Sequence, residues 1–334
     1  SDAGRVACYS RRMPSTDAAT RATEPAPRPD AQALLPRDEL AWGLLQPQPS
    51  IAPKFLYDAL GSKLFEAITE LDEYYPTRTE ASIFEQHRAA IAQACGSGRT
   101  LVDLGAGNCA KAAGLFDVLR PSCYVAVDIS VDFLRGALQA LQARYPQLPM
   151  TGVGIDFTAA LTLPPQAGSA TRLMFYPGSS IGNFAPEAAA SLLRRVRDAA
   201  PGGALLIGVD LIKPVDVLQR AYDDALGVTA AFNLNLLRHV NRLLGSDFDV
   251  GQWRHVALFD AAHARIEMHL EARCDLQVRW PGASLRRKAG ERVLTEIACK
   301  YTVEGFDALL RRAGYSHTRC WTDAQAWFAV FVAH

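Results

Sequence analysis

The sequence predicts an α/β protein built on a parallel sheet, and three stretches carry this prediction. Residues 101–119 have the pattern of a buried strand, a glycine turn and a helix, which is the first unit of a nucleotide-type α/β fold. Apolar strands are also predicted at residues 123–128 and 150–155, and an acidic residue ends or follows each of them. Ligands bind at the carboxyl ends of the strands in such sheets, so these stretches predict a ligand site.

The glycine turn contains Gly105 and Gly107. Glycine lets a ligand approach the backbone closely, and the helix that follows directs its N–H groups at that ligand. The turn departs from a dinucleotide-binding fingerprint because residues 108–110 replace the third glycine and its surroundings. It also lacks the Lys-Ser/Thr pair of a phosphate-binding loop, although Lys111 is close by. An ordinary buried α/β turn would account for this stretch taken by itself.

Two acidic residues narrow the choice of ligand. Asp128 lies about 20 residues beyond the glycine turn, where a carboxylate can accept both hydroxyls of a ribose. Asp156 and Phe157, after the third strand, suit the amine and the ring face of an adenine. Ribose and adenine contacts without a pyrophosphate clamp favour S-adenosylmethionine over NAD.

The composition excludes several other classes of protein. The 334 residues suffice for two domains or one large one, and 35 basic residues balance 35 acidic ones, which argues against a nucleic-acid partner. No apolar run approaches the ~20 residues that span a bilayer, so no membrane partner is expected. The seven cysteines are scattered without a CxxC pair, which argues against a metal site or disulfide framework. We expect a cytoplasmic monomer.

The segment before the first sheet strand has three predicted parts. Residues 1–32 are rich in Ala, Pro, Arg, Asp and Thr, which predicts a disordered or loosely attached arm without a signal peptide. A helix at residues 54–65 is expected to break near Gly61. Residues 71–78, with two tyrosines before Pro76, are expected to be extended, because proline disfavours the helical region in the residue before it.

The central part alternates strands and helices. Strands are predicted at residues 101–104, 123–128, 150–155, 171–175 and 204–210, with helices at 79–94, 110–120, 130–144 and 186–199. Residues 176–184, between the fourth strand and its helix, carry the small polar side chains Ser179, Ser180 and Asn183. This turn is expected at the carboxyl edge of the sheet, where ligands bind.

The pattern changes after residue 213. Residues 213–244 are predicted to be mostly helical, with a break near Gly227. Alternating patterns predict strands at 253–258, 265–273, 274–280 and 292–300, followed by a helix at 306–313 and strands at 320–323 and 327–332. A mixed segment that interrupts an α/β unit predicts an inserted second domain.

From about residue 50 to the end, the chain resembles the histidine-specific methyltransferases that make Nα-trimethylhistidine (hercynine) for ergothioneine biosynthesis. The matching motifs are FLYD at 55–58, EYYPTRTE at 73–80, GSSIGN at 178–183, AYDD at 221–224, GVTAAFN at 227–233, RIEM at 265–268 and LTEIACK at 294–300. Their order and spacing are specific, and residues 1–32 lie outside the resemblance.

The resemblance implies a class I (Rossmann-like) methyltransferase sheet with an inserted α+β substrate-binding domain. It implies a substrate-binding domain of residues 33–75 plus 214–300, and a methyltransferase domain of residues 76–213 plus 301–334. The implied activity is methylation of the α-amine of L-histidine, three times in succession, with S-adenosylmethionine as co-substrate and no metal.

The resemblance also implies roles for individual residues. Asn183 and Tyr222 would hold the substrate carboxylate. The catalytic Tyr57 and Tyr74, with the backbone of Gly178, would lie around the α-amine. Glu296 would hold the imidazole, and Phe232 and Met268 would line the side-chain pocket. The implied cofactor-binding residues are Gly105, Lys111, Asp128, Asp156 and Phe157.

The chain departs from the family at two places. Ala298 stands where bacterial histidine enzymes of this type usually have serine, which removes a hydroxyl partner for the imidazole. A lost hydrogen bond is worth roughly 0.5–1.5 kcal/mol, so histidine binding would weaken about threefold to tenfold. Residues 108–110 replace a more usual Ser/Thr-rich run, where we expect backbone contacts.

The same residues also allow a different substrate, or binding without catalysis. Ala298 suits the same chemistry on another free amino acid or on a modified histidine, and a non-catalytic ligand-binding relative would keep the fold. Packing of Tyr57 and Tyr74 in a core, and pairing of Glu296 with Lys300 or Arg292, are the alternatives to their roles in the site.

Overall fold

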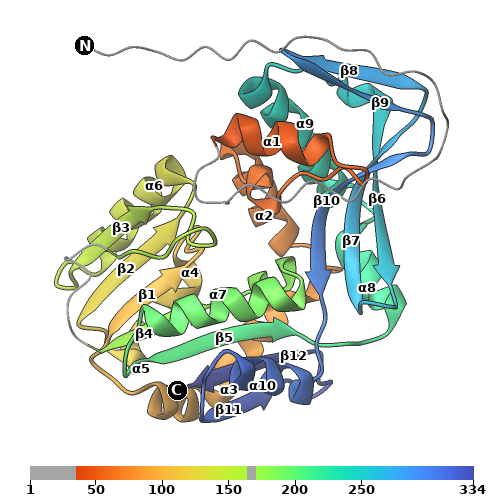
Figure 1. Cartoon of the computed structure of the whole chain (residues 1–334). Coiled ribbons are helices and arrows are strands. Elements are labelled where there is room, and N and C mark those ends of the chain that lie inside the picture. The colour runs from red at the N-terminus through yellow and green to blue at the C-terminus, as the bar shows by residue number, and fades with distance from the viewer. Residues whose placement is uncertain (1–34, 164–170) are drawn as a thin grey trace, which may run out of the picture.

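The computed structural model describes residues 35–163 and 171–334, and its centre is a seven-stranded sheet, whose place in the molecule Figure 1 shows. The strand order is β11-β12-β5-β4-β1-β2-β3. The strands are β1 (Thr100–Leu104), β2 (Cys123–Asp128), β3 (Met150–Gly154), β4 (Arg172–Tyr176), β5 (Ala204–Asp210), β11 (Thr318–Thr322) and β12 (Phe328–Ala333). Strands β1 to β5 are parallel, whereas β12 pairs antiparallel with β5 and β11. The predicted α/β class is therefore confirmed, and the predicted arm at residues 1–32 lies outside the described residues.

Helices cover both faces of this sheet. They are α3 (Tyr75–Cys95), α4 (Ala110–Ala113), α5 (Phe116–Leu119), α6 (Val131–Arg144), α7 (Pro186–Asp198) and α10 (Val303–Arg312). Successive strand residues point to opposite faces, so Leu101 packs with α3 to α6 while Val102 packs with α7 and α10. A parallel sheet buried on both faces needs continuous apolar strands, and β5 is buried at every position.

A second body gathers segments that are far apart in the sequence (Figure 1). It contains α1 (Pro36–Leu44), the 3₁₀ helix η1 (Pro53–Leu56), α2 (Ala59–Thr69), α8 (Val215–Tyr222), α9 (Val228–Leu244), the 3₁₀ helix η4 (Val250–Gln252), β6 (Trp253–Asp260), β7 (Arg265–Ala272), β8 (Leu276–Trp280), β9 (Ala283–Arg287) and β10 (Arg292–Cys299). Strands β10, β7 and β6 form an antiparallel sheet, and β8 pairs with β9. One hydrophobic cluster contains buried residues of both sequence segments that form this body, the first from Leu40 to Tyr75 and the second from Leu218 to Ala298.

The helix expected at residues 54–65 breaks earlier than predicted. The chain leaves η1 at Tyr57 and begins α2 at Ala59, where the Asp58 side chain accepts a hydrogen bond from the Gly61 amide at 2.8 Å. A Cβ at Gly61 would lie 1.8 Å from the carbonyl oxygen of Leu56. The glycine thus allows two turns to pack closely inside the N-capped helix, and does not end a helix.

The extended segment predicted around Pro76 is wrong for Tyr75 to Arg78. Helix α3 begins at Tyr75, and Pro76 occupies its first turn. Proline is compatible with that position because the first amides of a helix need no intrahelical acceptor. Tyr74 remains outside the helix, with φ −86° and ψ 74°.

Two further differences are local. The helix predicted at residues 110–120 is divided into α4 and α5 around Gly114. Strand β9 was not predicted at all, although its partner β8 was. Its short polar-rich sequence, ASLRR, is stabilised by the pairing with β8 and carries little apolar alternation of its own.

Candidate active site

The turn after β1 leaves open space above its backbone. Gly105 and Gly107 have φ values of +75° and +51°, and a Cβ added at either would meet no described atom within 4 Å. The amides of Gly105 and Ala106 donate to the Val127 carbonyl at 2.8 and 3.0 Å, which ties the turn to β2. The turn therefore forms a cradle in which a ligand can approach the backbone.

Asp128 closes this cradle from the end of β2. Its Oδ2 accepts a hydrogen bond from the Gly107 amide at 2.9 Å, and its Oδ1 accepts one from the Ser130 amide at 2.8 Å. A carboxylate offers about four lone-pair sites, so both oxygens can still accept hydroxyl groups. This half-buried position is compatible with binding a ribose.

Asp156 and Phe157 follow β3 at the same edge. Lys54 of η1 donates to Asp156 Oδ2 at 2.9 Å, so the second body reaches across to the sheet here. Burial alone would raise the pKa of Asp156, but hydrogen bonds from Thr158 and Lys54 outweigh it and hold the pKa below its usual value. Phe157 packs edge to face on Tyr176 of β4, with ring centroids 5.6 Å apart. An ionised carboxylate and an aromatic edge thus lie next to Asp128.

Glu80 of α3 lies between two predicted site residues and was not singled out from the sequence. Its side chain is 1% exposed, its Oε2 lies 2.6 Å from Lys111 Nζ, and its Oε1 accepts a hydrogen bond from the Gly178 amide at 2.8 Å. A Cβ at Gly208 of β5 would lie 2.0 Å from Oε1, so that glycine makes room for the carboxylate. The sequence did contain a signal: Glu80 lies three residues before Ile83 in the same helix, and this spacing places the glutamate on the apolar face of the helix.

Five aromatic rings, which we call the aromatic box, meet where α2, α8 and α9 approach the start of α3. The Tyr57 ring centroid lies 5.6 Å from those of Phe65 and Phe232, Phe65 lies 6.1 Å from Tyr74, and Tyr74 lies 6.4 Å from Tyr222. Burial raises the pKa of each tyrosine well above its usual value, so the three phenols stay protonated. Phe65 was missed because an aromatic residue on a helix face is ordinarily a core residue.

Strand pairing places Met268, Glu296 and Ala298 beside this box. In the register of β7 and β10, Glu296 lies opposite Met268 and Ala298 lies opposite Ile266. An irregularity between Leu294 and Glu296 shifts the register, and after it Glu296 and Ala298 share one face of β10. All three side chains are buried.

Glu296 has an unusual electrostatic environment. Burial raises its pKa to about 7, although the ammonium group of Lys300 partly opposes this shift. The alternative in which Glu296 pairs with Lys300 or Arg292 is wrong, since Lys300 pairs with Asp210 and Arg292 with Glu271. Within the described residues no ion pair reaches the Glu296 carboxylate, so it is available to a ligand.

Beside the box lies a buried ionic network, the Asp210 cluster, made of Asp210, Tyr75, Tyr222, Lys213 and Lys300. Lys213 Nζ lies 2.6 Å from Asp210 Oδ1 and 2.9 Å from the Tyr75 hydroxyl. Lys300 Nζ lies 2.8 Å from Asp210 Oδ2 and 2.9 Å from the Tyr222 hydroxyl. Burial alone would raise the pKa of Asp210, but the two ammonium groups outweigh it and lower the pKa. Burial lowers the pKa of Lys213 to about 8.

Asn183 lies in the 3₁₀ helix η3 (Ser180–Asn183), which packs against β10. A Cβ at Gly182 would lie 2.9 Å from the carbonyl oxygen of Cys299, so the close approach depends on this glycine. The Ser179 hydroxyl accepts a hydrogen bond from the Asp210 amide at 2.8 Å. The turn that carries Asn183 is thus tied to β5 at Asp210 and packs on β10 at Cys299.

A histidine supports Tyr222 from its backbone side. His255 Nε2 lies 2.8 Å from the Tyr222 carbonyl, and its Nδ1 lies 2.9 Å from the amide nitrogen of Asn233. Because the amide nitrogen donates, Nδ1 accepts and Nε2 carries the proton, which defines a neutral tautomer. Burial lowers the pKa of His255, in agreement with this state.

The two groups of predicted residues meet at one junction. The Ser130 hydroxyl, just after Asp128, donates to the Tyr57 carbonyl at 2.9 Å. The Asp128 carboxylate also adds to the raised pKa of Tyr57, after burial and closer groups. The structure therefore brings an open glycine cradle, two carboxylates and a box of protonated tyrosines into one region.

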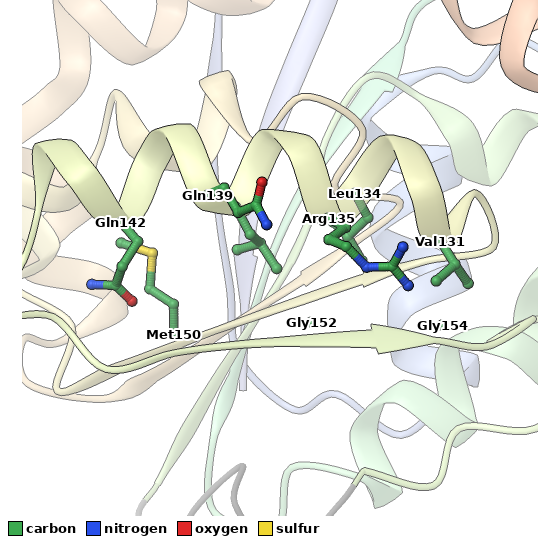
Figure 2. A pocket seen from close by; sticks show the side chains of 9 residues that line it. Val131, Leu134, Arg135, Gln139, Gln142, Met150, Gly152 and Gly154 are labelled. Carbon is green, nitrogen blue, oxygen red and sulfur yellow. The ribbon is translucent and has the colours of Figure 1, made fainter.

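One groove of the described surface lies outside this region. Figure 2 shows a groove between α6 and β3, lined by residues such as Val131, Gln139 and Gly154, and none of the predicted site residues lines it. A Cβ at Gly154 would lie 2.5 Å from Val131 Cγ2, so the glycine lets α6 pack onto the edge strand. In residues 35–163 and 171–334 no group of three His, Cys, Asp or Glu side chains could hold a metal ion. No helix in these ranges has both the length and the apolar character of a membrane span.

Comparisons with known proteins agree with this arrangement. The family model described as "Histidine-specific methyltransferase, SAM-dependent" matches residues 36–334. The chain is 42% identical to a histidine N-alpha-methyltransferase of Mycolicibacterium smegmatis over 91% of this chain and 96% of that protein, and 40% identical to one of Mycobacterium tuberculosis over the same shares. It is 31% identical to ergothioneine biosynthesis protein 1 of Neurospora crassa, over 80% of this chain and 31% of that longer protein.

Proposed function

Because the chain belongs to the histidine-specific, S-adenosylmethionine-dependent methyltransferase family, we propose that it methylates the α-amine of L-histidine three times in succession. The product would be Nα,Nα,Nα-trimethylhistidine (hercynine), an intermediate for ergothioneine biosynthesis. Three protonated tyrosines around one box and an unpaired carboxylate beside it support an amino-acid substrate with an N–H in its side chain.

The cofactor would bind along the carboxyl edge of β1 to β4. Gly105 would contact it through the backbone, Asp128 would accept the ribose hydroxyls, Asp156 and Phe157 would hold the adenine, and Lys111 would face its carboxylate. The cradle above the glycine turn and the spare lone pairs of Asp128 support this fit. S-adenosylmethionine supplies a methyl group on a sulfonium, which is a good leaving group.

The substrate would lie in the aromatic box with its three polar groups held apart. Asn183 and Tyr222 would bind the carboxylate, and Glu296 would accept the imidazole N–H. Phe232 and Met268 would line the space for the ring, because both are buried, Met268 lies opposite Glu296, and Phe232 packs against Tyr57. Holding the reacting amine in one orientation supplies much of the rate of a direct displacement.

Tyr57 and Tyr74 would act on the amine itself. A free amino-acid amine is mostly protonated at neutral pH and must lose a proton before its lone pair can react. Removal from bulk water favours the neutral amine, so the ammonium gives up its proton to solvent on binding, and phenol oxygens that accept the remaining N–H groups leave the nitrogen lone pair free. As methyl groups accumulate, the tyrosine faces stabilise the quaternary ammonium through cation–π attraction. One box therefore serves all three steps.

We further propose that the second body is the substrate-binding domain, residues 33–75 plus 214–300, and that residues 76–213 plus 301–334 form the methyltransferase domain. The hydrophobic cluster shared by Leu40 to Tyr75 and Leu218 to Ala298 supports this division. We also propose a cytoplasmic monomer, and the scattered cysteines support a reducing compartment. Size-exclusion chromatography with light scattering would test the oligomeric state.

The observation that carries the proposal is the buried Glu296, whose carboxylate has no cation partner within the described residues. The direct test is mass spectrometry after incubation with S-adenosylmethionine and each free amino acid in turn. A gain of three methyl groups on histidine alone supports the proposal. Methylation of a different amino acid would instead establish the alternative substrate, and no product with any amino acid would favour a ligand-binding relative.

Ala298 separates the two substrate alternatives. We expect Ala298→Ser to lower the dissociation constant of histidine about threefold to tenfold, because its hydroxyl would give the imidazole a second partner beside Glu296. Isothermal titration calorimetry with histidine measures the change. Cys299→Ser, a change to the same residue type at the next position, should leave the constant within about twofold. Weaker histidine binding by Ala298→Ser would favour another substrate.

Asp128 provides a test of the cofactor end. We expect Asp128→Asn to raise the dissociation constant of S-adenosylmethionine about 10- to 100-fold, because one acceptor for Gly107 or Ser130 and the charge at the ribose are both lost. Titration calorimetry measures it. The matched control is Asp132→Asn, whose side chain is 95% exposed, and which should bind the cofactor like the wild type. An unchanged constant in Asp128→Asn would refute the ribose role.

A further inference from the structure

The Asp210 cluster contains two lysine–tyrosine pairs with nearly the same geometry. The Lys213 ammonium lies 4.4 Å from the ring centroid of Tyr75, and the Lys300 ammonium lies 4.7 Å from that of Tyr222. Each ammonium donates to its tyrosine hydroxyl at 2.9 Å and contacts one oxygen of Asp210. Both lysine side chains are 1% exposed, so water does not compete for these hydrogen bonds.

The pairs differ in the hydrogen bond that the phenol itself donates. The Tyr75 hydroxyl donates to Asp210 Oδ2 at 2.6 Å, so its single proton is used inside the cluster. The Tyr222 hydroxyl accepts from Lys300 and has no acceptor within the described residues. A phenol has one proton, and the lone pair that faces Lys300 is occupied, so the Tyr222 proton must point away from the ammonium. Of the two tyrosines in the cluster, Tyr222 is the one that belongs to the aromatic box, where its ring faces that of Tyr74.

We propose that Lys300 is a positioning residue for the substrate: its hydrogen bond orients the Tyr222 hydroxyl so that the phenol donates its proton to the carboxylate of an amino acid. The inference rests on the proposed function in so far as the ligand is a free amino acid. Asp210 anchors Lys300 for this purpose, and the pair of Lys213 and Tyr75 has a structural role only.

The charge of Lys300 strengthens this arrangement. A hydroxyl that accepts a hydrogen bond from an ammonium is polarised, and it becomes a better donor in the next hydrogen bond of the chain. In the low dielectric of a buried site this chain ends best on an anionic oxygen. Without Lys300 no described side chain fixes the rotation of the Tyr222 hydroxyl, whose hydrogen-bond partner is that ammonium.

The test compares Lys300→Met with the matched control Lys213→Met, which removes an equally buried ammonium from the same carboxylate. The ligands are L-histidine and histamine, which lacks the carboxylate. Both are titrated at pH 7.5, where Glu296, with a pKa of about 7, and Lys213, with a pKa of about 8, are mostly charged. We expect Lys300→Met to weaken histidine binding about 10- to 100-fold and histamine binding less than about threefold. Lys213→Met should change both by less than about threefold, even if it lowers the Tm as much. In Tyr222→Phe the added Lys300→Met should have no further effect on histidine.

Several outcomes would overturn the proposal. Equal weakening of histidine and histamine by Lys300→Met would indicate a structural role, and so would equal losses of histidine binding in Lys300→Met and Lys213→Met. If the wild-type enzyme binds another amino acid and not histidine, the proposed substrate is wrong. The same comparison of variants is then made with that amino acid and its decarboxylated amine in place of histidine and histamine. An enzyme that binds no free amino acid would overturn both proposals.

Discussion

Replacing Glu296 with glutamine is expected to lower kcat/KM for histidine about 100-fold and to raise the Tm of the ligand-free enzyme at pH 8. The loss of activity follows because a hydrogen bond from the imidazole to a buried charged partner contributes about 1.5–3 kcal/mol. The gain in stability follows because burial raises the pKa of this carboxyl to about 7, so its ionised form is unfavourable in the folded state.

The direction of the pH dependence follows from the raised pKa of Glu296. In the unfolded chain the pKa of Glu296 is near its usual value, about 4.3. A raised folded pKa contributes stability that is fully present below this value and is lost as the pH rises through about 7. Well above pH 7 the ionised carboxylate thus costs the folded state at most about 4 kcal/mol, and Glu296→Gln removes this cost. The stabilisation by the variant should therefore be larger at pH 8 than at pH 5.

Steady-state kinetics with histidine and thermal unfolding at pH 5 and pH 8 measure both effects. The matched control is Glu271→Gln on β7, whose carboxylate is paired with Arg254 and Arg292 and has a lowered pKa. It should lower the Tm at pH 8 and leave histidine turnover nearly unchanged. Unchanged histidine kinetics in Glu296→Gln would refute the proposed contact with the imidazole, and a lower Tm at pH 8 would refute the uncompensated charge. Glu296→Ala should in addition admit apolar aromatic amino acids.

Asp210→Asn is expected to cause the largest loss of stability, about 3–5 kcal/mol. Asparagine keeps the size of the side chain but leaves Lys213 and Lys300 buried without an anion, and both side chains are 1% exposed. Removing one partner of a buried ionic group is costly because the remaining charges stay desolvated. Urea unfolding followed by circular dichroism measures the change in the free energy of unfolding.

A second substitution distinguishes uncompensated charge from a general packing defect. The double variant Asp210→Asn with Lys213→Met has one buried ammonium fewer, so it should recover part of the lost stability. A matched control is Asp224→Asn, a buried carboxylate that accepts hydrogen bonds from the backbone amides of Val228 and Thr229, and which should show no recovery with Lys213→Met. A double variant less stable than Asp210→Asn alone would contradict the role of charge.

Much of the fold could be predicted because its signals are local. The strands around the glycine turn are continuous apolar runs, and Gly105 and Gly107 have the positive φ values that only glycine adopts readily. The break near Gly227 is also present, where that residue has φ +76° between α8 and α9. The start of α3 at Tyr75 and the strand β9 were not predicted, because a proline is compatible with two backbone conformations and β9 depends on its partner.

The candidate site also contains residues whose position the sequence indicates and residues whose position it does not. Asp128 and Asp156 could be placed at one edge of the sheet from their positions at or after strand ends, because parallel strands end at one edge whatever the rest of the chain does. Glu80, Phe65 and Lys300 could not, since a glutamate, a phenylalanine and a lysine acquire a special role only from the residues that face them. Lys300 was considered as a partner of Glu296, which is close in sequence, whereas it pairs with Asp210 from another strand.

The sequence by itself determined the α/β class, the edge of the sheet at which Asp128 and Asp156 lie and, through its motifs, the family to which the chain belongs. These depend on periodicity, turn chemistry and residue identity, which are properties of short segments. Only the tertiary structure decided that Glu296 is buried without a cation and that the proton of Tyr222, unlike that of Tyr75, is not used inside the cluster. Burial and hydrogen-bond partners are set by groups far apart in the chain, so no local pattern contains them.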